Sequence, residues 1–201
     1  LKKIDILVGT QMVTKGLDLD NISLVGVLNA DSLLKYPDLR ANERAFQLLT
    51  QVAGRAGRRQ KQGNVIIQTF DPAHPVIVET IQMMYKRFFN RESTERKIFK
   101  YPPYYRMIQI EFLHKNAEIV AGAAFEFAKI VKPKLGERVL GPAVPSIARI
   151  RGYFINTITI KMEKNQNVVD GIKKMIMHTS GTVKNIPAYK YVRINLDVDP
   201  Y

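Results

Sequence analysis

The 201-residue sequence contains no cysteine. Disulfide bonds and thiolate metal sites are therefore excluded within these residues. The three histidines (His74, His114 and His178) lie far apart and lack the spacing of metal ligands, so we interpret them as surface or partly buried side chains. No apolar run approaches the roughly 18 residues of a membrane span. These absences favour a folded soluble protein, and the lack of cysteine suits the cytoplasm.

The sequence also lacks a signal peptide, because "LKKIDILVGTQ" has no long apolar core and no cleavage site. The motif Gly-x-x-x-x-Gly-Lys-Ser/Thr, whose backbone cradles the phosphates of ATP, does not occur. The chain starts at Leu1, without an initiator methionine, and almost directly with a strand-like pattern. We therefore expect it to be a fragment of a longer protein.

Acidic residues are few compared with basic ones, at 18 Asp+Glu against 31 Lys+Arg and a net charge of +13. Residues 1–82 carry 10 Lys+Arg and 8 Asp+Glu, whereas residues 83–201 carry 21 and 10. A basic excess concentrated in one half indicates a polyanionic partner. A basic surface that is merely solvated remains the alternative.

The first 82 residues alternate between strand and helix patterns. Short apolar runs that end in polar residues predict buried strands at 4–10, 22–31 and 63–70. A helical period covers 42–55, and the segment from Asp71 opens with residues typical of a helix start. Such alternation predicts a parallel α/β sheet, whose ligands bind at the carboxyl ends of the strands, here at 9–10 and 29–31.

The second half begins with a charged segment, 84–100, which we interpret as a long helix between two domains that Pro102 and Pro103 terminate. The following patterns predict strand 107–113, helix 117–132, strand and loop 139–145, strand 153–162, helix 168–178 and strand 191–197. This order predicts an α+β ferredoxin-like domain.

The stretch "QLLTQVAGRAGRR" (47–59) ends a helical pattern with arginines separated by glycines. A glycine inside a helix costs about 1 kcal/mol relative to alanine, so the spacing suggests that backbone must approach a ligand closely. Arginine matches phosphate oxygens with two parallel hydrogen bonds, and near a γ-phosphate it stabilises phosphoryl transfer. The contributing residues are Gln51, Gly54, Arg55, Gly57 and Arg58.

This spacing resembles motif VI of the superfamily 2 helicases, and "VGTQMVTKGLDLDN" (8–21) resembles their motif V. The resemblance implies that Thr10, Gln11 and Lys15 contact a nucleic-acid backbone, which positions the strand without reading its sequence. Gly16 then allows close backbone approach, and Asp18 accepts a hydrogen bond from the nucleotide's ribose or from motif VI. Taken alone, Gly16 and Asp18 would be a turn glycine and a helix N-cap.

Further segments narrow the resemblance: "QTFDPAHPVI", "YPPY", "VLGPA", "IARIRG" and "LDVDP" occur in the same order in the primosomal replication-restart DNA helicases. The similarity runs from about residue 4 to the end. It implies that 1–82 is the C-terminal part of RecA-like helicase lobe 2, which is a parallel α/β sheet. Residues 83–103 become a linker helix and proline turn, and 104–201 a ferredoxin-like C-terminal domain that binds DNA and partners.

The resemblance also implies ATP and Mg²⁺, held mainly by a first lobe that we expect outside this chain, and zinc, held by a cysteine-rich module that is equally outside it. Arg55 and Arg58 would face the ATP of the other lobe, with Arg58 as the arginine finger. Gln51, Gly54 and Gly57 would line the same nucleotide site. The fragment alone should therefore not hydrolyse ATP.

In the C-terminal domain, "SIARIRGYFINTITIK" (146–161) is the predicted basic surface, with Arg149, Arg151, Tyr153 and Lys161 as its DNA-binding residues. Cations beside aromatic rings suit single-stranded nucleic acid, because bases stack while phosphates are neutralised. The resemblance adds the acidic tail of single-stranded-DNA-binding protein as a partner. An edge strand protected by charges is the alternative.

The resulting hypothesis is part of an ATP-dependent 3′-to-5′ DNA helicase that recognises stalled forks in the bacterial cytoplasm, at the nucleoid, and starts primosome assembly. One alternative is a non-enzymatic module that binds nucleic acid or a partner. Another superfamily 2 helicase is the third possibility.

Overall fold

The computed structural model describes residues 5–10, 23–35, 38–54 and 63–200. The chain is a mixed α/β protein that divides into two compact units, Leu1–Arg91 and Glu92–Pro200. The boundary between them falls inside helix α5 (Tyr85–Ile98). Each unit has its own sheet and its own hydrophobic core.

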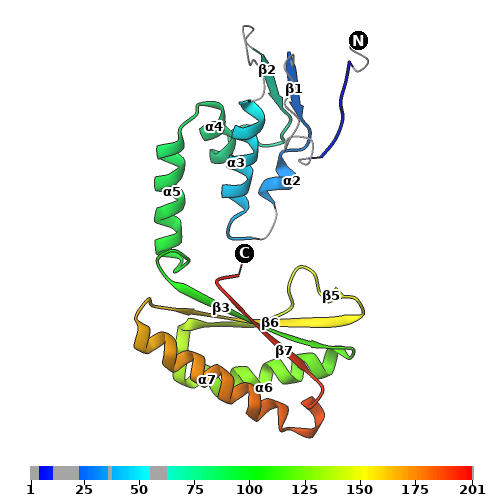
Figure 1. Cartoon of the computed structure of the whole chain (residues 1–201), viewed down its shortest axis with the longest axis vertical. Coiled ribbons are helices and arrows are strands. Elements are labelled where there is room, and N and C mark those ends of the chain that lie inside the picture. The colour runs from blue at the N-terminus through cyan, green and yellow to red at the C-terminus, as the bar shows by residue number, and fades with distance from the viewer. Residues whose placement is uncertain (1–4, 11–22, 36–37, 55–62, 201) are drawn as a thin grey trace. The chain divides into compact units, whose positions relative to one another are not determined.

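The first unit contains a two-stranded parallel sheet (Figure 1). Strand β1 (Leu24–Val27) pairs with β2 (Asn64–Ile67). Parallel neighbours require a crossover connection, and it includes helices α2 (Asp31–Leu34) and α3 (Ala41–Ala53). The prediction of a parallel α/β sheet is confirmed for these two strands.

The strand predicted at 4–10 is wrong for the residues that the structure describes, Asp5–Thr10. They form no strand, and Ile6 and Val8 are 82% and 84% exposed. A strand is stabilised by backbone hydrogen bonds to a neighbouring strand, and neither of the two sheets found among the described residues includes this segment. An apolar run by itself therefore does not make a strand.

The core of the first unit forms between α3, α4 (Pro75–Ile81) and the beginning of α5. The rings of Phe46 and Phe88 stack with their centroids 4.2 Å apart. The carboxylate of Glu79, 1% exposed, pairs with Arg91 at 2.9 Å. Helix α4 begins later than the predicted start at Asp71, because the imidazole of His74 accepts a hydrogen bond from the backbone N–H of Val76 and so caps the helix at this point.

The second unit has an antiparallel sheet in the order β4-β6-β3-β7, with β5 paired to β6. Its elements along the chain are β3 (Arg106–His114), α6 (Ala117–Leu135), β4 (Val139–Ala143), β5 (Arg149–Ile150), β6 (Tyr153–Met162), α7 (Gln166–Lys184) and β7 (Arg193–Val198). Short 3₁₀ turns, Gly136–Arg138 and Pro187–Tyr189, precede β4 and β7. The strands and helices predicted in this half are confirmed, but β5 was not expected. Helix α7 starts two residues earlier and ends six residues later than predicted.

Asparagines set the start of both long helices. The side chain of Asn116 accepts hydrogen bonds from the N–H groups of Glu118 and Ile119, and that of Asn165 caps α7 in the same way. Such caps satisfy backbone donors that the helix itself leaves without a partner.

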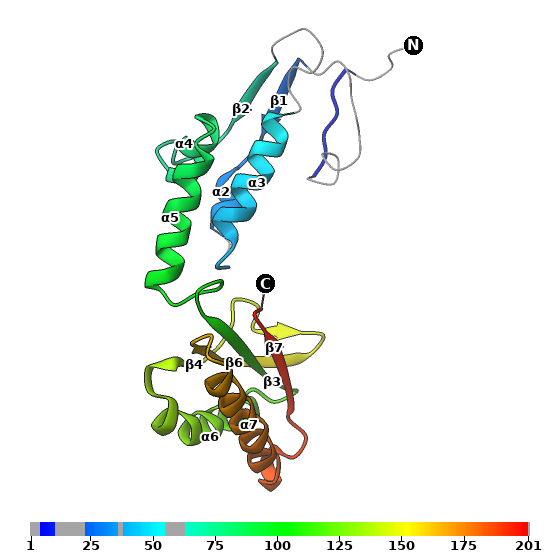
Figure 2. The same ribbon diagram turned by 60° about the vertical axis from the view of Figure 1, so that its left-hand side comes forward.

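Both helices lie on one face of the sheet, as Figures 1 and 2 show. Alternate residues of β3 and β6, such as Ile110, Phe112 and Ile158, point into the core beneath them, where Phe112 meets Phe127 edge-on. The opposite side, which we call the open face, carries the remaining residues of each strand. On β6 these include Tyr153 at one end and Lys161 at the other.

Candidate nucleic-acid interface

A tight hairpin joins β5 to β6. Arg149 lies opposite Phe154 and Ile150 opposite Tyr153, so Arg151 and Gly152 form a two-residue turn. Both turn residues have positive φ angles, 48° and 85°, which matches the turns whose twist suits antiparallel strands. The turn leaves Arg151 exposed at the tip, next to Arg149 and Tyr153.

Two arginines stack on aromatic rings at this end of the sheet. The Cζ atom of Arg149 lies 4.8 Å from the ring centroid of Phe154. Arg193, the first residue of β7, lies at the same distance from the ring of Tyr153. These residues, namely Arg149, Arg151, Tyr153, Phe154 and Arg193, form what we call the hairpin cluster. Its two stacked pairs lie on opposite faces of the sheet: Phe154 packs against the core on the helix side, with Arg149 over it, whereas Tyr153 and Arg193 lie on the open face.

Arg193 was not predicted, because it is 40 positions from Tyr153 in the sequence. Only the strand order brings the start of β7 near the hairpin. The alternation in "YVRINLDV" places Arg193 on the same face as the polar residues of its strand. This pattern indicates that Arg193 lies on the surface, but it does not indicate that Tyr153 is its neighbour.

The charge of the hairpin cluster is available to a ligand. Its three arginines are exposed, and none forms an ion pair with a carboxylate among the residues described. Stacking contributes about 0.5–1 kcal/mol at exposed sites and holds each guanidinium plane in place. Planar arginines and half-buried rings offer surfaces for bases, and the outward N–H groups suit phosphates.

Protection of a sheet edge accounts for part of this arrangement, because β5 and β7 are edge strands that carry Arg149 and Arg193. It does not account for the stacking. A charge that only blocks strand addition needs no fixed orientation, whereas both guanidinium groups here lie over ring faces.

The structure does not bring Lys161 to the other predicted residues. It lies eight positions from Tyr153 along β6, which corresponds to about 26 Å of strand. Its Nζ donates a 2.7 Å hydrogen bond to the carbonyl oxygen of Phe99 and lies 3.6 Å from the ring centroid of Tyr101. Burial, and secondly the charge of Lys100, lowers the pKa of Lys161. The predicted basic surface therefore consists of two separate sites.

The predicted sites of the first unit are described only in part. Gln51 is exposed in α3, and Thr10 is exposed outside any helix or strand. Gly54 ends α3 at φ −69°, and among the described residues an added Cβ would meet the carbonyl oxygens of Thr50 and Gln51, at 3.5 and 3.7 Å. The described turns of α3 therefore do not by themselves require a glycine at this position. The residues outside the described part are Gln11, Lys15, Gly16, Asp18, Arg55, Gly57 and Arg58.

Asp31, at the predicted ligand-binding edge, has a structural role instead. Its carboxylate accepts hydrogen bonds from the N–H of Phe70 at 3.0 Å and the hydroxyl of Thr69 at 3.1 Å. The bond from Phe70 contributes most to lowering the pKa of Asp31, and burial opposes it. Asp31 thus links the segments that follow β1 and β2.

Within the described residues, no group of three or more His, Asp and Glu side chains could hold a metal ion. The helices described there are also too short or too polar to cross a membrane.

Comparisons with known proteins agree on one family. Residues 97–201 match the family model described as primosomal protein N C-terminal domain. The chain is 40% identical over 201 residues to the replication restart protein PriA of Bacillus subtilis, covering 99% of this chain and 24% of that protein. The corresponding protein of Synechocystis is 41% identical over 199 residues, covering 98% and 23%. That of Chlamydia pneumoniae is 36% identical over 202 residues, covering 98% and 26%. The chain thus spans about a quarter of the length of these relatives.

Proposed function

This chain belongs to the family of the replication restart protein PriA, and from that membership we propose that it is the part of a superfamily 2 DNA helicase that carries motifs V and VI and a C-terminal DNA-binding domain. The intact protein would act at stalled forks, where it translocates 3′ to 5′ and starts primosome assembly. The relatives are about four times as long as this chain, so these activities would require a longer protein.

The hairpin cluster is the observation that carries the DNA-binding part of this proposal. It joins three exposed arginines to two aromatic rings on a unit with a large basic excess. We assign this unit to the ferredoxin-like folds, since its elements run strand, helix, strand, strand, helix, strand in a sheet of order β4-β6-β3-β7, apart from the short β5. We assign the first unit to RecA-like lobe 2, supported by its parallel strands and crossover helices.

The helicase part rests on the sequence of motifs V and VI. ATP and Mg²⁺ would be held mainly by the other lobe, with Arg58 as the arginine finger and Arg55 beside it. Neutralising charge on the transferred phosphoryl group is worth on the order of 10³-fold or more in rate. Zinc, the single-stranded-DNA-binding protein and other primosome proteins would associate with the intact protein.

A salt titration tests DNA binding by this chain. For a single strand, the logarithm of the association constant falls with the logarithm of salt concentration with a slope of about −0.7 per phosphate neutralised. We expect the double variant R149Q/R193Q to bind more weakly and with a shallower slope. The control K173Q/K174Q removes two exposed lysines of α7, outside the hairpin cluster, and should retain the wild-type slope. Equal slopes for the two double variants would contradict the assignment.

The helicase assignment is tested separately in the full-length protein. Arg58→Ala should lower the DNA-stimulated ATPase rate by about 10³-fold while DNA binding persists. A rate near that of the wild type would eliminate Arg58 as the finger.

A further inference from the structure

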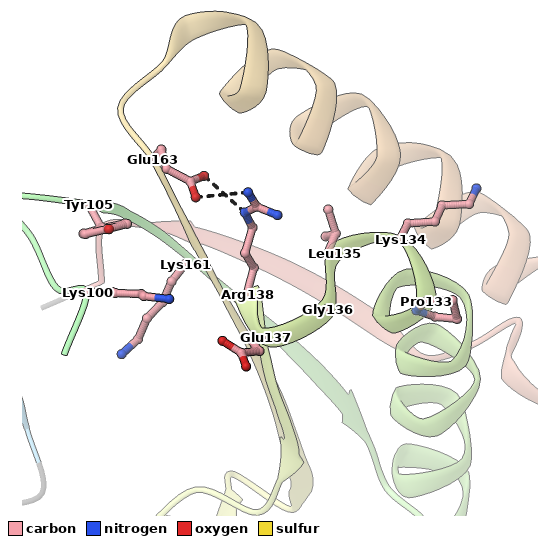
Figure 3. A pocket seen from close by; sticks show the side chains of 10 residues that line it. All are labelled: Lys100, Tyr105, Pro133, Lys134, Leu135, Gly136, Glu137, Arg138, Lys161 and Glu163. Atoms are coloured by element: carbon pink, nitrogen blue, oxygen red, sulfur yellow. Dashed lines mark hydrogen bonds and ion pairs between the residues drawn. The ribbon is translucent and has the colours of Figure 1, made fainter. Parts of the chain in front are cut away.

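A second basic site lies at the far end of β6, away from the hairpin cluster. Lys161 borders a hollow of about 470 Å³ within the second unit, between the segment that follows α5, the end of α6 and the end of β6 (Figure 3). The lining residues are Lys100, Tyr105, Pro133, Lys134, Leu135, Gly136, Glu137, Arg138, Lys161 and Glu163.

One ion pair in the hollow neutralises itself. The guanidinium group of Arg138 donates two hydrogen bonds to the carboxylate of Glu163, at 3.1 and 3.0 Å. These bonds, more than any other cause, hold the pKa of Glu163 below its usual range. The pair is therefore occupied. The other charged groups that line the hollow are the three lysines and the carboxylate of Glu137, so the net charge left by these groups is positive.

Two of those lysines face the same space. Figure 3 shows Lys100 and Lys161 next to each other, whereas the side chain of Lys134 points away from them. Neither Lys100 nor Lys161 forms an ion pair with a carboxylate among the residues described. Their mutual repulsion contributes to the lowered pKa of Lys161. An anion placed between them would relieve this repulsion.

Lys161 is also held in position before any ligand arrives. Its bond to the carbonyl of Phe99 uses one of three N–H donors, and the ring of Tyr101 supports the ammonium group from one side. Because the ring also takes up one side of the ammonium group, at least one donor remains for a ligand. A lysine that is already ordered loses less side-chain entropy on binding than a free surface lysine.

We propose that this hollow binds a phosphoryl group between Lys100 and Lys161, with the hydroxyl of Tyr105 as a further donor. A phosphoryl group fits because it is compact, carries more than one oxygen acceptor, and can neutralise two point charges at once. The group belongs either to the backbone of a bound DNA strand or to a free phosphate ion. The first source rests on the proposed function, since it requires that DNA also contact this unit.

The binding of free phosphate can be observed at the lysines themselves. In the 201-residue chain with ¹³C-labelled lysines, the Cε resonance of Lys161 should shift and saturate as inorganic phosphate is added, with chloride at equal ionic strength as the control. In K100Q the shift should need at least several-fold more phosphate. The K161Q variant assigns the resonance.

The source is then distinguished by single-stranded DNA. If a backbone phosphate occupies the hollow, K100Q/K161Q should make the salt slope shallower by about 0.7, whereas K173Q/K174Q should not. A saturable phosphate shift with an unchanged slope assigns the site to free phosphate. The proposal is overturned if the slope is unchanged and phosphate affects Lys161 no differently from chloride. Either result is independent of R149Q/R193Q, which tests the hairpin cluster, and unfolding midpoints show whether each variant is folded.

Discussion

Replacing Tyr153 by alanine separates base stacking from charge neutralisation in the hairpin cluster. The substitution removes the ring on which Arg193 lies, 4.8 Å from its centroid, but it removes no charge. Tyr153 is half-buried on the open face and is not part of the core beneath the helices. We therefore expect a small loss of stability and a larger loss of DNA affinity.

The size of that loss follows from stacking energies. Base–aromatic stacking is worth about 1–3 kcal/mol per base, so its loss should raise the dissociation constant roughly 5- to 150-fold. The salt slope should stay at the wild-type value, because every phosphate-binding cation is still present. Arg193→Gln should show the complementary result, a slope shallower by about 0.7.

Fluorescence anisotropy with a labelled oligothymidine, measured at several salt concentrations, provides both quantities. Tyr153→Phe is the matched control: it keeps the ring, so its affinity should equal that of the wild type. If Tyr153→Ala binds as tightly as the wild type, the ring is not a stacking surface. If its slope falls as much as that of Arg193→Gln, Tyr153 acts only by orienting the arginine.

Three further predictions concern stability. The hydrogen bond from Phe70 lowers the pKa of Asp31 in the folded protein. The ionised carboxylate therefore stabilises the fold above the pKa of the unfolded state, and this stabilisation is lost as pH falls through the lower pKa of the folded state. Between about pH 5 and pH 3, the unfolding temperature measured by circular dichroism should therefore fall less for Asp31→Asn than for the wild type. An equal fall in the two proteins would contradict this. Gly141→Ala places a Cβ 2.7 Å from a backbone carbonyl oxygen, at φ +97°, so its free energy of unfolding in urea should fall by about 2 kcal/mol or more. In the control Gly152→Ala, at φ +85° but with open space around the Cβ, it should fall by about 1 kcal/mol. Equal losses would refute the steric argument. Phe127→Ala should cost about 3–5 kcal/mol in the same assay, and a loss below 1 kcal/mol would contradict its place in the core.

Local patterns were sufficient for most of the second unit. The alternation of "MIQIEFL" and "FINTITIKM" placed β3 and β6 within a residue of their observed ends, because one face of each strand is buried under helices. The same information failed at 5–10, where the described residues form no strand although several of them are apolar. Periodicity reports which side chains favour burial, but the pairing that makes a strand is a property of the whole sheet.

The candidate site shows the same limit at the level of charge. Arg149, Arg151 and Tyr153 could be predicted together because a tight turn keeps near neighbours close. The sequence did not show that Lys161 belongs to a different site, because this depends on the extended strand that places it about 26 Å from Tyr153. Nor did it show that Arg193 belongs to the hairpin cluster, because this depends on the strand order.

On the open face, the side chains along β6 differ in charge from those toward β7. Between the Tyr153–Arg193 pair of the hairpin cluster and Lys161, β6 presents Ile155, Thr157 and Thr159 on this face. On the same face, Glu111 of β3 lies opposite Thr157, and Asp197 of β7 lies opposite Gln109 of β3. A DNA strand that contacted both basic sites would therefore follow β6, because a path displaced toward β7 brings its phosphates close to carboxylates, which repel them.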